Sequence, residues 1–168
     1  MLKIICGDIT KIKVDAIVNV ANTSLLCSGG LNRKIHRAAG PELLAECKTL
    51  GGCKPGNAKV SGSGKLPCKF VIHAVAPRWF GGEYGEREML ISCYRTSLEL
   101  ANEKKIATVA FPLISTGIYR YPKQDAIKIA VDTISDFLRE NEMTVYIVVF
   151  DARTMEICKA SFSEYIEE

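Results

Sequence analysis

The sequence has no long uninterrupted apolar run, no low-complexity tract and no block of like charges. A helix that spans a bilayer needs about 20 predominantly apolar residues, so no membrane span is predicted. The first ten residues, MLKIICGDIT, reach a lysine and a Gly-Asp pair too early for the apolar core of a secretory signal. We therefore expect a cytoplasmic protein with no membrane partner.

Spacings typical of metal sites and disulfide frameworks are also missing. The cysteines number seven, which is odd, and no two of them form a CxxC pair. The only histidines, His36 and His73, stand at no recognisable zinc spacing from a cysteine or a carboxylate. We expect reduced thiols, no metal and no cofactor.

The composition is that of a folded globular chain, with 48% hydrophobic and 24% charged residues. A net charge of +3 permits an anionic ligand and does not by itself indicate nucleic acid. No linker and no internal repeat interrupts the chain, so we expect one domain over residues 1–168.

Short β-rich runs alternate with helical patterns along the chain. Several of these runs are almost continuously apolar, which is typical of strands covered on both faces. The predicted strands are residues 2–6, 16–21, 57–62, 69–76, 106–113 and 144–150. Four segments carry apolar residues at helical spacing, starting near Leu31, Met89, Ala126 and Met155.

This alternation predicts an α/β fold, a three-layer α/β/α sandwich with a central sheet. The connection between the third and fourth predicted strands is of the hairpin type and is too short to hold a helix. We therefore expect a mixed sheet, in which one strand runs against the others.

Unusual residues follow three of the predicted strands, at the edge where ligands bind in open α/β sheets. Two of these strand ends are short-residue turns, Ser28-Gly29-Gly30 and Ser115-Thr116-Gly117, and at the third Asp151 follows the strand's last residue, Phe150. Backbone amides in such turns can approach a phosphate closely. Taken alone, however, the glycine pair favours an ordinary tight turn, and an aromatic residue at a strand end is more often core.

Asn22, Asn32 and His36 form a polar group beside the first turn. Asn32 and His36 are four residues apart, hence on one helix face, and Asn22 ends the preceding strand. They could surround a ligand. Equally, Asn22 could cap a turn and His36 could donate to a backbone carbonyl; the residues alone leave both interpretations open.

The assembled motifs resemble the macrodomain family of the MacroD type, an ADP-ribose-binding module, over essentially the whole chain. The motifs are GDIT at 7–10, VDAIVNVANTSLL at 14–26, IHRAAGPELL at 35–44, CKPGNAKVS at 53–61, VIHAVAP at 71–77 and FPLISTGIYRYP at 111–122. Their common order and spacing make the resemblance specific.

The resemblance implies a role for each matching position. Asp8 would accept a hydrogen bond from the adenine amino group, the two turns would hold the diphosphate, and Asn22 would bond the distal ribose. The implied ligand-binding residues are Asp8, Ile9, Asn22, Ser28, Gly29, Gly30, Ser115, Thr116, Gly117, Ile118, Tyr119 and Phe150. The expected partner is ADP-ribose or an ADP-ribosylated protein.

The sequence departs from the family at the implied catalytic set of Asn32, Asn22 and His36. Hydrolytic members carry Gly-Gly-Gly-Gly-Val-Asp-Gly where this chain reads CSGGLNR from Cys27 to Arg33, so the catalytic aspartate is Asn32. An amide cannot accept a proton from water. Arg120 likewise replaces a glycine of the second turn.

Three functions remain open at this stage. The first is a module that binds ADP-ribose without hydrolysing it. The second is an enzyme that removes ADP-ribose from acidic residues, or acetyl from O-acetyl-ADP-ribose, with substrate phosphate as the base. The third, which the mild charge does not favour, is a binder of single-stranded nucleic acid or poly(ADP-ribose). It would use the arginines at positions 33, 37, 78 and 120.

Overall fold

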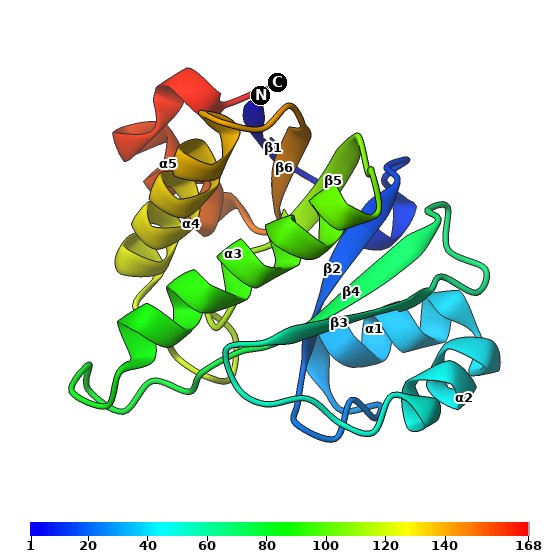
Figure 1. Cartoon of the computed structure of the whole chain (residues 1–168). Helices are drawn as coiled ribbons and strands as arrows, with labels where there is room; N and C mark the ends of the chain where they lie inside the picture. The colour runs from blue at the N-terminus through cyan, green and yellow to red at the C-terminus, as the bar shows by residue number, and fades with distance from the viewer. Residues whose placement is uncertain (168) are drawn as a thin grey trace.

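A six-stranded sheet runs through the centre of the molecule (Figure 1). The computed structural model describes residues 1–167. The strand order is β1-β6-β5-β2-β4-β3, and β3 alone among these is antiparallel to its neighbour, β4. The strands are β1 (Leu2–Cys6), β2 (Ala16–Ala21), β3 (Ala58–Gly62), β4 (Phe70–Val75), β5 (Thr108–Pro112) and β6 (Thr144–Val149). The mixed sheet predicted from the sequence is confirmed.

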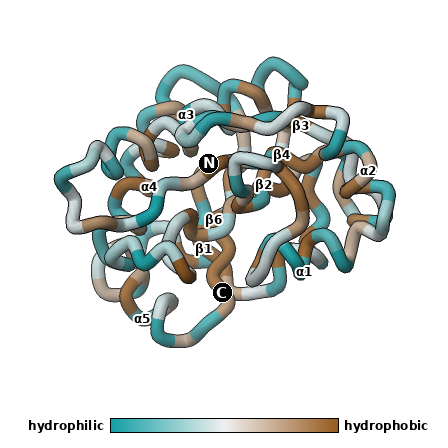
Figure 2. The backbone as a smooth tube through the Cα atoms, turned by 90° about the horizontal axis from the view of Figure 1, so that it is seen from below, coloured by the Kyte–Doolittle hydropathy of each residue, from teal (hydrophilic) through white to brown (hydrophobic). Residues whose placement is uncertain are grey.

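Helices cover both faces of this sheet, which confirms the predicted α/β/α sandwich. The helices are α1 (Gly30–Ala39), α2 (Pro41–Thr49), α3 (Glu86–Glu103), α4 (Lys123–Leu138) and α5 (Ala152–Ser161), with short 3-10 turns η1 (Ile9–Lys11) and η2 (Ser163–Tyr165). One apolar core lies under α3, α4 and α5, and a second lies under α1 and α2. Figure 2 shows the hydrophobic stretches concentrated along the central strands.

Two features of the helices differ from the sequence prediction. Helix α2 was not among the four predicted helices, because it buries only Leu43 and Cys47 and so has a short apolar stripe. The apolar spacing of Met155, Cys158, Phe162 and Tyr165 would continue the last helix to Tyr165, whereas α5 ends at Ser161 because Phe162 leaves the helical region with φ −137° and ψ 38°. Within residues 1–167, no helix combines the length and apolar content needed to cross a bilayer.

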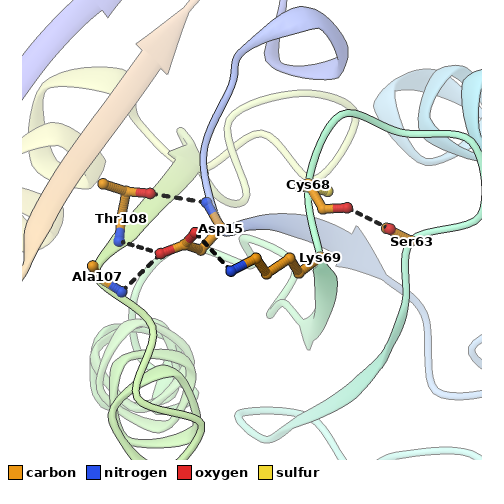
Figure 3. A network of polar contacts seen from close by, with 6 residues as sticks. All are labelled: Asp15, Ser63, Cys68, Lys69, Ala107 and Thr108. Atoms are coloured by element: carbon orange, nitrogen blue, oxygen red, sulfur yellow. Dashed lines mark hydrogen bonds and ion pairs between the residues drawn. The ribbon is translucent and has the colours of Figure 1, made fainter.

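Asp15 ties together the amino ends of three strands (Figure 3). Its carboxylate accepts hydrogen bonds from the amides of Ala107 and Thr108 at 2.9 and 3.2 Å, just before and at the start of β5. Its backbone carbonyl accepts from the amides of Lys69 and Phe70, where β4 begins. These bonds hold β2 between β4 and β5 at the edge opposite the candidate site.

The two central strands, β2 and β5, separate at their carboxyl ends. β2 pairs with β5 only at Ala16↔Val109 and Ile17↔Ala110, whereas it pairs with β4 along its full length. The chain then leaves β2 toward α1 on one face and leaves β5 toward α4 on the other. This is the topological switch point at which open α/β sheets bind ligands. We call this edge, with the residues that follow β1, β2, β5 and β6, the strand-end site.

His73 on β4 is a fully buried polar group with partners on both neighbouring strands. Its Nδ1 lies 3.1 Å from Asn19 Nδ2 on β2, and its Nε2 lies 2.8 Å from Ser61 Oγ on β3. Burial, with a smaller contribution from His36, lowers the pKa of His73 to about 4. The imidazole is therefore neutral in the folded protein at neutral pH.

We expect the folded protein to lose about 2 kcal/mol of stability between pH 7 and pH 5 because of His73. Its folded pKa lies below the ordinary value of 6.5, so the unfolded chain binds more protons in this range. The contribution of neutral His73 to folding stability is complete above pH 6.5 and decreases as the pH falls toward 4. Urea denaturation at the two pH values and an NMR titration of the His73 ring measure this directly. A ring that titrates near 6.5 in the folded state would contradict the assignment.

Candidate functional site

Asp8 lies just after β1 and caps the short turn η1. One carboxylate oxygen accepts hydrogen bonds from the Thr10 hydroxyl at 2.6 Å and the Thr10 amide at 3.0 Å. The other lies 3.1 Å from the ammonium of Lys34. The Thr10 hydroxyl above all, then the Thr10 amide and Lys34, holds the pKa of Asp8 below its usual range. The group is an ionised acceptor at the end of β1.

Lys34 is a member of this site that the sequence did not reveal. It stands on the exposed side of α1, and its pairing with Asp8 depends on how α1 packs against η1. No local pattern signals a contact between residues 26 positions apart. The Lys34 ammonium places a cation next to the carboxylate that the resemblance assigns to adenine.

The first loop joins β2 to α1 and contains Ser28, Gly29 and Gly30. Gly30 has φ +62°, a conformation that favours glycine, and it opens the helix. Gly29 is the N-cap of α1 and has no side chain to satisfy the first amides of the helix. These open amides and the positive end of the helix dipole face the end of β2.

Asn32 links this loop to the sheet. Its Nδ2 donates to the Val20 carbonyl at 3.1 Å, and its Oδ1 accepts from the Ser28 amide at 2.9 Å. The Val20 residue lies in the part of β2 that no longer pairs with β5. The Asn32 side chain is only 2% exposed, so both ends of the amide are used within the protein.

Asn22 and His36 occupy different environments. The Asn22 side-chain oxygen accepts hydrogen bonds from the amide and the hydroxyl of Ser24 at 3.1 and 2.6 Å. Asn22 therefore caps a turn, which was one of its two interpretations. His36 does not donate to a backbone carbonyl: both ring nitrogens are buried without a hydrogen-bond partner among residues 1–167. Burial lowers the pKa of His36, so its ring favours the neutral form.

The second loop follows β5 and has an unusual backbone. Ser115 has φ +69°, which is uncommon for a residue with a side chain and is typical of functional sites. Its hydroxyl donates to the Pro77 carbonyl at 2.8 Å, and its carbonyl accepts from the Tyr121 amide at 2.9 Å. These bonds fix both ends of the loop.

Between these fixed ends, four consecutive amides are open. Within residues 1–167, none of the amides of Thr116, Gly117, Ile118 and Tyr119 donates to a backbone carbonyl. The Thr116 hydroxyl is turned inward, since it donates to the Leu113 carbonyl at 2.9 Å. A run of open amides of this kind is suited to an anion.

Large apolar side chains are exposed around the strand ends. Ile118 is 83% exposed and Phe150 is 84% exposed, so the core interpretation of Phe150 is wrong. Tyr119 is half-buried, and the Arg78 guanidinium lies 5.0 Å from its ring centre. Exposed apolar groups beside open amides are typical of a surface that receives a ligand.

A separate cavity of about 340 Å³ lies on the α1–α2 side of the first loop. Its lining includes Cys27, Arg33, His36, Arg37, Pro41 and Leu44. No residue of the second loop lines it, so the cavity adjoins the strand-end site only through the first loop. Across the described part of the chain, no group of three or more His, Cys, Asp or Glu side chains is placed to hold a metal ion. All seven cysteines have free thiols.

Comparison with known proteins identifies relatives across nearly the full length. A family model described as Macro domain matches residues 18–130. A macro domain-containing protein of Methanosarcina mazei is 52% identical over 167 residues, covering 98% of this chain and 89% of that protein. An O-acetyl-ADP-ribose deacetylase of Citrobacter rodentium is 48% identical over 162 residues, covering 93% of this chain and 92% of that protein.

A solved structure also matches the fold of this chain. A mutant macrodomain of Oceanobacillus iheyensis, determined with ADPR, has a TM-score of 0.92 and 40% sequence identity to this chain. The match covers 97% of this chain and 92% of that one.

Proposed function

The chain belongs to the macro domain family, and we propose that its strand-end site binds ADP-ribose. One observation carries the proposal. Two loops with open amides follow the neighbouring strands β2 and β5, at the point where these strands part. A diphosphate placed there would accept hydrogen bonds from both loops and would meet the positive end of α1. We propose that residues 1–168 act as one such domain.

The adenosine half of the ligand would lie toward β1 and β6. Asp8 offers an ionised acceptor for the adenine amino group, beside the backbone of Ile9. The exposed ring of Phe150 offers a flat apolar face for the base. The relative determined with ADPR supports this ligand class.

The distal ribose would lie toward β2 and the second loop, near Asn22 and Tyr119. The deacetylase relative favours a second function, which is hydrolysis of an ester on this ribose. Asn32 weighs against an efficient reaction, because its amide cannot take a proton and both its ends are already bonded. We therefore propose ADP-ribose recognition as the main function, with hydrolysis limited by the missing carboxylate.

Replacing Asp8 by asparagine is expected to weaken ADP-ribose binding by about 10- to 100-fold, the usual effect of losing a hydrogen bond to a charged group. Asparagine keeps an oxygen that can accept from Thr10, so the turn η1 is preserved. Its amide nitrogen is a donor and would face the adenine amino group. Calorimetric titration of the unaltered and altered chains with ADP-ribose measures the difference.

The matched control is Asp132→Ala, which removes one negative charge from the exposed surface of α4. That variant should bind ADP-ribose as the unaltered chain does. Equal affinities for the Asp8→Asn variant and the unaltered chain would remove the adenine assignment. The absence of any saturable heat for the unaltered chain would remove the proposed function itself.

A further inference from the structure

The cavity beside the first loop is built on α1 and on the start of α2. Lys34 reaches Asp8, whereas its neighbours on the helix, Arg33 and Arg37, line the cavity. Arg33 and Arg37 are four residues apart and therefore neighbours on the helix surface. The cavity is thus a second, cationic surface that shares α1 with the strand-end site.

The two arginines of the cavity have no carboxylate partner. Neither Arg33 nor Arg37 lies within ion-pair distance of an acidic side chain in the described residues. Of the described residues, no acidic one lines the cavity, while Pro41 and Leu44 form an apolar wall. Two unpaired guanidinium groups above an apolar wall suit a carboxylate on a short aliphatic stem.

His36 gives an independent sign that the cavity can receive a polar group. The residue is 7% exposed, it lines the cavity, and neither of its ring nitrogens has a hydrogen-bond partner among residues 1–167. A buried polar group without a partner is destabilising, and native proteins seldom keep one without a use. A carboxyl or amide group that entered the cavity would lie close to this ring.

We propose that this cavity binds an acidic segment of the polypeptide to which ADP-ribose is attached. The inference rests on the proposed function, because the ADP-ribose held at the strand-end site would bring that polypeptide alongside the first loop. Cys27 belongs both to that loop and to the cavity wall, so the two surfaces are continuous. Once ADP-ribose is bound, the second contact is intramolecular, and a modest interaction then has a measurable effect on affinity.

The test compares two synthetic peptides that carry ADP-ribose through the same stable linkage. In one peptide glutamates flank the modified residue, and in the other glutamines replace them. The unaltered chain should bind the glutamate peptide about 10-fold more tightly at roughly 0.1 M salt, and the difference should shrink as salt is added. Arg33→Glu and Arg37→Glu should each abolish the preference.

Arg139→Glu is the charge-matched control, since Arg139 follows α4 on the opposite face of the sheet. That variant should keep the preference for the glutamate peptide. Free ADP-ribose should bind all four proteins within about twofold, because the cavity lies outside the strand-end site.

Equal affinity of the unaltered chain for the two peptides would overturn the inference and leave the proposed function standing. Loss of the preference in the Arg139→Glu variant would also overturn the inference. Weaker binding of free ADP-ribose by the Arg33→Glu or Arg37→Glu variant would overturn it as well. No binding of free ADP-ribose by the unaltered chain would overturn the proposed function, and the inference would fall with it.

Discussion

Replacing Asn32 by aspartate is expected to raise the rate of ester hydrolysis by about 10²–10⁴-fold, the usual contribution of a general base. This corresponds to roughly 3–5 kcal/mol of activation free energy. The substrates to use are O-acetyl-ADP-ribose and a glutamate-linked ADP-ribosylated protein. The quantity to measure is free acetate or free ADP-ribose released per unit time.

The environment of Asn32 explains this expectation. A carboxylate at this position can still accept from the Ser28 amide, as Asn32 Oδ1 does at 2.9 Å. It cannot donate to the Val20 carbonyl, which now accepts from Asn32 Nδ2. The oxygen that replaces Nδ2 would be repelled by that carbonyl and would take a water as its partner. With the distal ribose bound as proposed, a water held by this carboxylate would be placed to attack an ester on it.

ADP-ribose affinity is the control for this variant, because binding needs no base. The Asn32→Asp protein should bind ADP-ribose within a few-fold of the unaltered chain. Loss of the bond to Val20 should also cost about 1 kcal/mol of folding stability. Hydrolysis by the unaltered chain at the rate of the variant would mean that substrate phosphate and bound water suffice, and that the protein is an effective hydrolase.

Replacing Gly117 by valine is expected to weaken ADP-ribose binding by up to about 100-fold while the fold is kept. A clash with a bulky side chain typically costs about 1–3 kcal/mol, and the upper part of this range corresponds to that loss of affinity. Gly117 lies among the four open amides of the second loop. Added methyl groups would occupy the space through which a phosphate reaches those amides.

The surroundings of Gly117 separate this effect from misfolding. A Cβ added there meets no atom within 4 Å, and Gly117 does not have the positive φ that side chains avoid. The melting temperature should therefore change little, and Gly117→Ala should show a smaller loss of affinity than Gly117→Val. Normal binding by the valine variant would mean that the second loop does not hold the phosphates.

The strands and the mixed sheet were predictable because buried strands and a short hairpin connection leave clear patterns in the sequence. Helix α2 was not, since two buried residues make too short a stripe. Phe150 was assigned to the ligand site only through the family resemblance, because an aromatic residue at a strand end is more often core. Here the chain leaves the sheet at Phe150 and exposes the ring.

The sequence pointed to the two loops of the proposed strand-end site but not to the contacts that the side chains around them make. Glycines at strand ends indicated where a phosphate could approach. The bond from Asn32 to Val20 was hidden, because it joins a side chain to a backbone carbonyl that is free only where β2 parts from β5. The pairing of Lys34 with Asp8 was hidden for a related reason, since it depends on tertiary packing.

The most direct test of the account is a titration of the isotope-labelled chain with ADP-ribose, followed by amide NMR. We predict saturable changes at the amides of Gly29, Gly30 and residues 116–119, with smaller changes at Ile9 and none along the strand ends tied by Asp15. Changes confined to other regions of the chain, or no change at millimolar ligand, would contradict the proposal that the strand-end site binds ADP-ribose.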